Sequence, residues 1–136
     1  MDFTEMTLAE IANFVEEHQQ EMGAHGNSAD EVQAKVSTGK AVLETRTFGF
    51  ALIELTPTSD GKTIPHLWLL YVFPESRGRT LGRRFVRELL AKYATDFHMS
   101  LWCEGPRRRA FFGRLGFRVE LREGEMRRMT TNDYRG

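Results

Sequence analysis

The stretch LWLLYVFPESRGRTLG, residues 67–82, decides the fold. It begins with an unbroken apolar run that is too short for a membrane span and has the length of a buried strand. A proline, a loop with two arginines and a helix follow it. Where such a loop enters a helix, unpaired N–H groups meet the positive end of the helix dipole. The stretch therefore predicts an anion-binding turn between a buried strand and a helix.

This stretch resembles the signature of the GNAT family of N-acetyltransferases, a strand ending in Val-x-Pro followed by a loop of the pattern Arg/Gln-x-x-Gly-x-Gly/Ala. Val72, Pro74, Arg77 and Gly82 match the signature, and Thr80 replaces its middle glycine. We expect the Thr80 hydroxyl to cap the helix or to donate to a phosphate. The resemblance implies that the loop wraps the pyrophosphate of acetyl coenzyme A and that the main chain of the strand holds the pantetheine arm. The coenzyme-binding residues expected from these two segments are Leu70, Tyr71, Val72, Arg77, Gly78, Arg79, Thr80, Leu81 and Gly82.

A second resemblance lies in FFGRLGF, residues 111–117, which matches the latter half of the GNAT pattern Asn-x-x-Ala-x-x-Phe-Tyr-x-x-x-Gly-Phe. Arg108 replaces the alanine of that pattern, and Phe112 replaces the tyrosine that protonates the departing thiolate in many members. Phenylalanine has no proton to donate, so slow transfer is expected unless Tyr71 or Tyr134 supplies a hydroxyl. The resemblance adds Arg108 and Phe112 to the expected coenzyme-binding residues.

Composition and charge predict a single domain over residues 1–136. The chain is 40% hydrophobic and 28% charged, as in ordinary globular proteins. A single cysteine, Cys103, allows no disulfide within the chain, and we expect a cytoplasmic protein without a membrane span. Residues 1–68 carry 4 basic and 11 acidic side chains, net −7, whereas residues 69–136 carry 15 and 8, net +7. This asymmetry indicates a polyanionic ligand for the basic half and a cationic one for the acidic half, or mutual attraction of the halves.

The rest of the pattern predicts a mixed, mostly antiparallel sheet of about seven strands with helices between them. The expected strands are Phe3–Met6, 41–45, 48–55, 66–73, 99–104, 117–121 and 125–129. Capping boxes at Thr7–Glu10 and Ser28–Glu31 open two helices that should end near Gly23 and at Gly39. Two further helices are expected from Leu81 to Tyr93 and from Pro106 to Gly116.

The resemblance implies an α/β acyltransferase fold of the GNAT type, with its sheet splayed at the centre and helices on both faces. It also implies that the segment between the first two helices, Gly23–Asn27, lines the pocket of the acceptor.

Acetyl transfer to an amine needs a group that removes a proton from nitrogen. His66 lies at the start of the central strand, where several histone-modifying GNAT members carry a catalytic glutamate. Its ordinary pKa of about 6.5 suits proton removal at neutral pH. Glu54 and Glu44 on the preceding hairpin are rival bases, so the sequence leaves the choice open.

Arg107, Arg108 and Arg109 open a short helix, where cations oppose the helix dipole. These charges would be balanced by the 3'-phosphate of coenzyme A, by an acidic partner or by nucleic acid. Alternatively, the three arginines form an exposed charged surface that has no partner. The histidines and Cys103 show no metal-ligand spacing, so we expect no metal site.

The expected function is acetyl-coenzyme-A-dependent transfer of an acetyl group to a primary amine of a small molecule or a protein. The alternative is a catalytically degenerate GNAT-fold protein that acts as a binding or structural module. Expected partners are acetyl coenzyme A and an amine acceptor, with no membrane, in a monomer or a homodimer. A nucleic-acid contact of the arginine-rich half is a third and less favoured alternative.

The anion-binding turn generates a first prediction. Replacing Arg77 and Arg79 by alanine should weaken binding of acetyl coenzyme A by about 1.5–3 kcal/mol for each charge-assisted bond that is lost. Calorimetric titration measures this affinity, and thermal unfolding checks that the fold is retained. An unchanged affinity in the double variant would contradict the assignment of the pyrophosphate to this turn.

Overall fold

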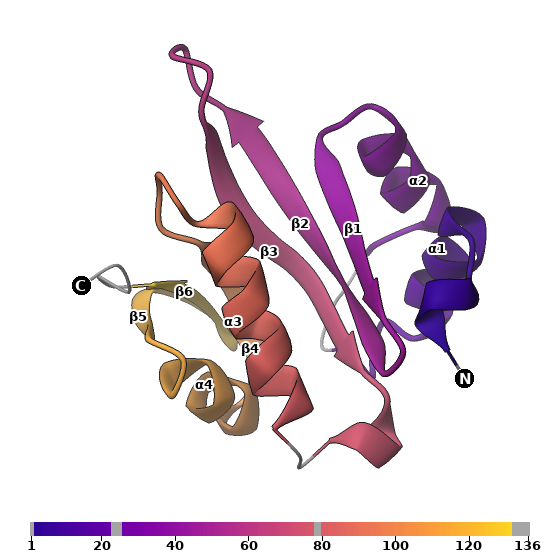
Figure 1. Ribbon diagram of the computed structural model, residues 1–136. Coiled ribbons are helices and arrows are strands. Elements are labelled where there is room, and N and C mark those ends of the chain that lie inside the picture. The colour runs from indigo at the N-terminus through magenta and orange to yellow at the C-terminus, as the bar shows by residue number, and fades with distance from the viewer. Residues whose placement is uncertain (1, 23–25, 78–79, 132–136) are drawn as a thin grey trace. The chain divides into compact units, whose positions relative to one another are not determined.

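The computed structural model describes residues 2–22, 26–77 and 80–131 (Figure 1). These residues form two compact units that interleave along the chain. The first unit comprises Met1–Leu55 and Trp68–Arg77, and the second comprises Thr56–Leu67 and Gly78–Gly136. Strand β3, Thr63–Val72, therefore passes from the second unit into the first after Leu67.

Six strands follow one another in the order β1-β2-β3-β4-β6-β5. The pairs β1/β2, β4/β6 and β5/β6 are antiparallel, and β3/β4 is parallel. The sheet is thus mixed and mostly antiparallel, as the sequence predicts, with one strand fewer than the expected number of about seven. Among the described residues, no helix combines the length and the apolar character that crossing a bilayer requires.

The first unit contains two α-helices, strand β1, most of β2 and the end of β3. Its elements are η1 (Phe3–Glu5), α1 (Leu8–Glu17), α2 (Ala29–Ser37), β1 (Ala41–Arg46), β2 (Gly49–Pro57) and η2 (Pro74–Ser76). The predicted hairpin is confirmed, since β1 pairs with β2 from Ala41↔Glu54 to Arg46↔Gly49. Helices α1 and α2 pack on each other, and α2 contacts β1 (Figure 1).

The predicted strand at Phe3–Met6 is wrong, because Phe3–Glu5 form the short 3-10 helix η1. An oxygen of Asp2 accepts a hydrogen bond from the Thr4 amide at 2.9 Å, which turns the chain at this point. The turn buries Phe3 completely, with its ring centroid 5.4 Å from Phe50 and 5.8 Å from Tyr71. The missing strand accounts for the difference between six strands and about seven.

The capping box at Thr7 is confirmed, since Thr7 and Glu10 each accept a hydrogen bond from the other's backbone amide. Helix α1 ends at Glu17, however, well before the predicted end near Gly23. His18 Nδ1 lies 2.8 Å from the Phe14 carbonyl, and Gln19 Nε2 donates to the Val15 carbonyl at 2.5 Å. The Gln19 side chain takes the Val15 carbonyl that the Gln19 amide would use in a continuing helix, whereas the Phe14 carbonyl still accepts from the His18 amide.

The second unit contains α3 (Leu81–Tyr93), β4 (Ser100–Glu104), α4 (Pro106–Gly113), β5 (Phe117–Glu123) and β6 (Met126–Thr131). The face of α3 that the sequence predicts to be apolar is buried at Phe85 and Leu89. Helix α4 contacts β4 and β5, and it ends a few residues before the predicted end at Gly116. Gly116 instead has a positive φ of 92°, which turns the chain into β5.

Strand β2 approaches β3 closely at Gly49, where a side chain has no room. A Cβ atom built on Gly49 would overlap the carbonyl oxygen of Tyr71 and would lie 3.1 Å from the Val72 Cα. Close backbone approach of this kind is a site where only glycine fits.

We therefore expect Gly49→Ala to lower the free energy of unfolding by about 3 kcal/mol, because the overlapping atoms belong to the backbone and cannot rotate away. Urea denaturation measures the change. Gly113→Ala is the matched control, since a Cβ at Gly113 meets nothing within 4 Å and should change stability by less than about 1 kcal/mol. Equal effects of the two substitutions would contradict the close approach.

Candidate active site and coenzyme-binding residues

Strand β3 contributes to both units. In the second unit it pairs in parallel with β4, with the register His66↔Ser100 and Leu67↔Leu101. In the first unit Trp68 contacts Lys35 of α2, and Tyr71 contacts Phe14 of α1. Burial alternates along the strand, so that Tyr71 lies in the core of the first unit and Trp68 is half-buried against that core.

Tyr71 is the centre of a polar and aromatic cluster in the first unit. Its hydroxyl donates to Oε1 of Glu21 at 3.1 Å, and Nη2 of Arg77 lies 3.2 Å from the same oxygen. The Arg77 guanidinium also lies 5.3 Å from the Tyr71 ring centroid, and its Nε donates to the Val72 carbonyl at 2.8 Å. Arg77 therefore holds the end of β3 to Glu21, a residue that the sequence pattern did not single out.

The surroundings of Tyr71 change its acidity. Burial of the hydroxyl, and next the negative charge of Glu21, raise the pKa of Tyr71 above its ordinary value of 10.0, while Arg77 acts in the opposite direction. The side chain is only 4% exposed. Tyr71 thus keeps its proton at neutral pH, and Glu21 accepts the hydrogen bond that it donates.

The turn before α3 is described only from Thr80 onward, and two of its expected coenzyme ligands, Gly78 and Arg79, lie outside the described residues. Thr80 is the residue that caps α3, but its side chain makes no capping hydrogen bond, so the expectation that its hydroxyl caps the helix is wrong. The backbone of Thr80 is already helical, with φ −75° and ψ −3°, whereas a capping hydroxyl needs an extended backbone. Leu81 is half-buried and Gly82 is buried at the start of α3.

The first turn of α3 has backbone amides that no side-chain cap from Thr80 satisfies. These backbone amides donate no hydrogen bond to the Thr80 side chain, and this turn carries no acidic side chain. The start of the helix therefore has donors and a positive dipole end that an anion can use.

The candidate base His66 belongs to the second unit, at the paired end of β3. Its Nδ1 lies 2.7 Å from Oγ of Ser100, the residue opposite it on β4. Ser100 is 7% exposed, so the partner of the imidazole is itself held inside the unit. This hydrogen bond orients the His66 ring, and Ser100 is a second residue that the sequence pattern did not single out.

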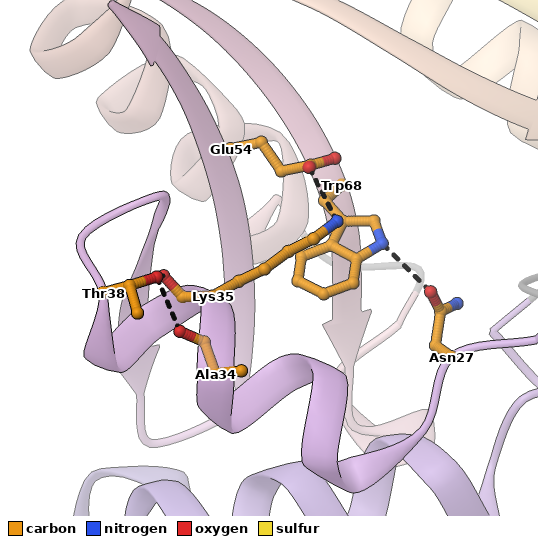
Figure 2. Close-up of polar contacts among 6 residues, drawn as sticks. All are labelled: Asn27, Ala34, Lys35, Thr38, Glu54 and Trp68. Carbon is orange, nitrogen blue, oxygen red and sulfur yellow. Dashed lines mark hydrogen bonds and ion pairs between the residues drawn. The ribbon is translucent and has the colours of Figure 1, made fainter.

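The rival bases Glu54 and Glu44 lie in the first unit, and both form ion pairs. Glu54 Oε2 lies 2.9 Å from Lys35 Nζ, as Figure 2 shows, and Glu44 Oε1 lies 3.4 Å from Arg46 Nη1. Each of the two rival bases is therefore already engaged by a cation of the chain, through a charge-assisted contact.

Helix α4 presents Phe112 to the interior of the second unit. Phe112 is 7% exposed, and its ring makes edge contacts with Phe111 and Phe117 at centroid distances of 5.0 and 5.5 Å. Arg108 is half-buried and donates to the Glu104 carbonyl at 3.3 Å. Cys103 is also buried, and burial raises the pKa of its thiol.

The sequence matches the family described as Acetyltransferase (GNAT) family over residues 4–117. The chain belongs to the GNAT acetyltransferases. No curated protein matches it significantly.

Solved structures share the GNAT fold at low sequence identity. An acetyltransferase from Thermus thermophilus is 20% identical with a TM-score of 0.62, and the match covers 90% of this chain and 86% of that one. A PaiA N-acetyltransferase from Thermoplasma acidophilum, solved with coenzyme A, is 16% identical with a TM-score of 0.61, covering 88% and 78%. Naa20 from Chaetomium thermophilum, solved with a bisubstrate analogue, is 14% identical with a TM-score of 0.65, covering 90% and 82%. These likenesses show the fold.

The residues expected from the GNAT resemblance are divided between the two units. Leu70, Tyr71, Val72 and Arg77 belong to the first, and Thr80, Leu81, Gly82, Arg108 and Phe112 belong to the second. The segment Gly23–Asn27, expected to line the acceptor pocket, is described only at Gly26 and Asn27, and Tyr134 lies outside the described residues. Within the described ranges, no group of three or more His, Cys, Asp or Glu side chains is placed to hold a metal ion.

The raised pKa of Tyr71 predicts a loss of stability at alkaline pH. Above about pH 10 the unfolded chain releases a proton that folded Tyr71 retains, so the free energy of unfolding should fall until the pH passes the folded pKa. Tyr71→Phe should remove this part of the slope in urea denaturation between about pH 9 and 11. Tyr93→Phe serves as the control and should keep the wild-type slope. Equal slopes for wild type and Tyr71→Phe would show that Tyr71 does not cause the effect.

Proposed function

We propose that this protein transfers the acetyl group of acetyl coenzyme A to a primary amine of a small molecule or a protein. The observation that carries the proposal is the start of α3, which follows the central strand β3 in a GNAT chain and has first-turn amides without a Thr80 cap. Pyrophosphate is an anion of the kind that such amides bind. The solved relatives that hold coenzyme A or a bisubstrate analogue support this ligand.

The main chain of Leu70, Tyr71 and Val72 is the proposed partner of the pantetheine arm. Their place at the C-terminal end of β3, just before the turn that leads into α3, supports this role. Backbone N–H and C=O groups that no neighbouring strand uses can bond to a ligand. We assign the phosphates of coenzyme A to the turn from Arg77 to Gly82, and Arg108 would supply a further positive charge.

His66 is the proposed general base, and Glu54 is the second candidate. The amine nitrogen bonds to the thioester carbonyl carbon, the carbon–sulfur bond breaks, and a proton leaves the nitrogen. His66 would take that proton directly or through a water molecule, because neutral imidazole is available near pH 7. The hydrogen bond to Ser100 supports the role, since a base that is oriented by a neighbour transfers protons efficiently.

The departing thiolate lacks the usual tyrosine, because Phe112 stands at that position of the GNAT pattern. The thiolate then leaves as an anion or takes its proton from water, and transfer is slow. Tyr71 keeps its proton at neutral pH, but its hydroxyl is directed to Glu21.

A second candidate function is a GNAT-fold protein that binds coenzyme A without catalysing transfer. The observation that favours it is the burial of Phe112 among Phe111 and Phe117, which gives this side chain a packing role.

Substitutions at Phe112 and His66 separate the two candidates. We expect wild type to release thiol slowly from acetyl coenzyme A in the presence of an amine acceptor, Phe112→Tyr to raise the turnover rate, and His66→Ala to lower it. A lost general acid or base costs roughly a hundred- to ten-thousand-fold in rate. Thiol release is measured across polyamines, aminoglycosides, amino acids and lysine peptides.

The control is calorimetric titration of each variant with acetyl coenzyme A, which separates a change in coenzyme affinity from a change in transfer rate. His98→Ala is the matched control for His66→Ala and should keep the wild-type rate. If no acceptor gives release above the buffer rate, Phe112→Tyr restores none and the coenzyme still binds, the binding-protein function replaces the enzyme.

A further inference from the structure

The first unit contains an ammonium group bound between an aromatic ring and a carboxylate. Nζ of Lys35, from α2, lies 4.3 Å from the ring centroid of Trp68 and 2.9 Å from Oε2 of Glu54. Figure 2 shows the lysine side chain running across the face of the indole to reach the carboxylate. A ring face and a carboxylate are the two groups with which proteins recognise organic ammonium ions. The contacts of Lys35 thus show that this site accommodates an aliphatic ammonium group.

The ring of Trp68 is held in position without help from Lys35. Its indole N–H donates to Oδ1 of Asn27 at 3.1 Å (Figure 2). The Asn27 amide N and Nδ2 donate to Oε1 of Gln19 at 3.1 and 3.2 Å, and Gln19 Nε2 donates back to the Asn27 carbonyl at 3.0 Å. Removal of Lys35 therefore leaves these bonds in place, and the ring face stays oriented for a cation.

Lys35 is held loosely in comparison. The side chains of Lys35 and Glu54 are each 30% exposed, so water reaches the ion pair. Ion pairs with this exposure contribute little, and the lysine stem is flexible. Another ammonium group can therefore replace that of Lys35 at small cost.

We propose that Trp68 and Glu54 form the binding site for the cationic amine of the acceptor, and that Lys35 is the resident ammonium that the acceptor displaces. The ligand class is an aliphatic primary ammonium. The site immediately precedes the residues of β3 that we assign to the coenzyme arm, and it lies in the acidic half of the chain, which carries a net charge of −7 over residues 1–68. The proposal rests on the proposed function only where it identifies this ammonium with the acceptor.

A purely structural role for the same contacts makes a different prediction. If the Lys35–Glu54 pair only ties α2 to β2, then emptying the site should weaken the fold and create no affinity for amines. The two roles are separated by measuring amine binding directly, without coenzyme and without turnover.

The probe is n-butylammonium chloride, and the signal is the fluorescence of Trp68 in a Trp102→Phe background, which leaves Trp68 as the remaining tryptophan of the two in the chain. Lys35→Met removes the resident ammonium and retains an apolar stem. We expect it to bind the probe about three- to tenfold more tightly than the Lys35 protein does, the scale of one cation–π contact. Glu54→Gln added to Lys35→Met should reverse the gain, and n-butanol, which lacks the charge, should not bind.

Lys40→Met is the matched control, because it removes one positive charge from an exposed lysine of the same unit. It should leave the affinity for the probe unchanged. If Lys35→Met and Lys40→Met gain the same affinity for the probe, the gain comes from the change in net charge and the proposal is overturned. The proposal is also overturned if Lys35→Met gains no affinity.

A measurement on the unmodified protein covers the case in which Lys35→Met does not fold. Titration with n-butylammonium should shift the NMR resonance of the Trp68 indole N–H, whereas equal sodium chloride should not. A resonance that stays in place would overturn the proposal.

Kinetics separate a failure of this site from a failure of the proposed function. If the protein transfers acetyl groups, Lys35→Met should lower KM for the amine acceptor and leave KM for acetyl coenzyme A unchanged. Transfer with an unchanged acceptor KM overturns the proposed site alone. Amine binding without any transfer overturns the enzymatic function and the identification of the ammonium as an acceptor, and retains an ammonium-binding site.

Discussion

Strand β3 is shared by the two units, and the packing of both is organised around it. Up to Leu67 the strand pairs with β4 in the second unit. From Trp68 it belongs to the first unit, where Trp68 contacts α2 and Tyr71 contacts α1. The alternation of its side chains buries Tyr71 in the core of the first unit and leaves Trp68 half-buried. One strand thus supplies His66 to the second unit and Leu70–Val72 to the first.

The polar contacts around this strand are built on residues from distant parts of the chain. Glu21 receives hydrogen bonds from both Tyr71 and Arg77, and Asn27 receives the indole N–H of Trp68. These bonds join the segments that follow α1 to β3. Gly49 makes the approach of β2 to the same strand close enough to exclude any side chain. Side-chain bonds and one close backbone approach in the first unit thus fix the region of β3 that we assign to ligands.

The departures from the GNAT pattern have local structural explanations. Phe112, at the position of the usual tyrosine, contributes its ring to an aromatic contact with Phe117 of β5. Thr80, at the position of the middle glycine, adopts a helical backbone that any residue tolerates, so the structure itself does not require glycine there. Each of these side chains makes an internal contact or adopts a backbone that the fold accepts without a ligand.

The sequence alone predicted the family and most of the order of the elements. The Val-x-Pro and Gly-Phe motifs, the Thr7–Glu10 capping box and the β1–β2 hairpin depend on neighbouring residues, and the hairpin and the box are confirmed. Only the tertiary structure decided the end of α1, the conversion of Phe3–Glu5 into a 3-10 helix and the partners of the candidate site. Glu21 bonds to Tyr71, Lys35 to Glu54 and His66 to Ser100, and these pairs are separated by 50, 19 and 34 residues. Local propensity cannot encode such pairs, because they form only when packing has brought the elements together.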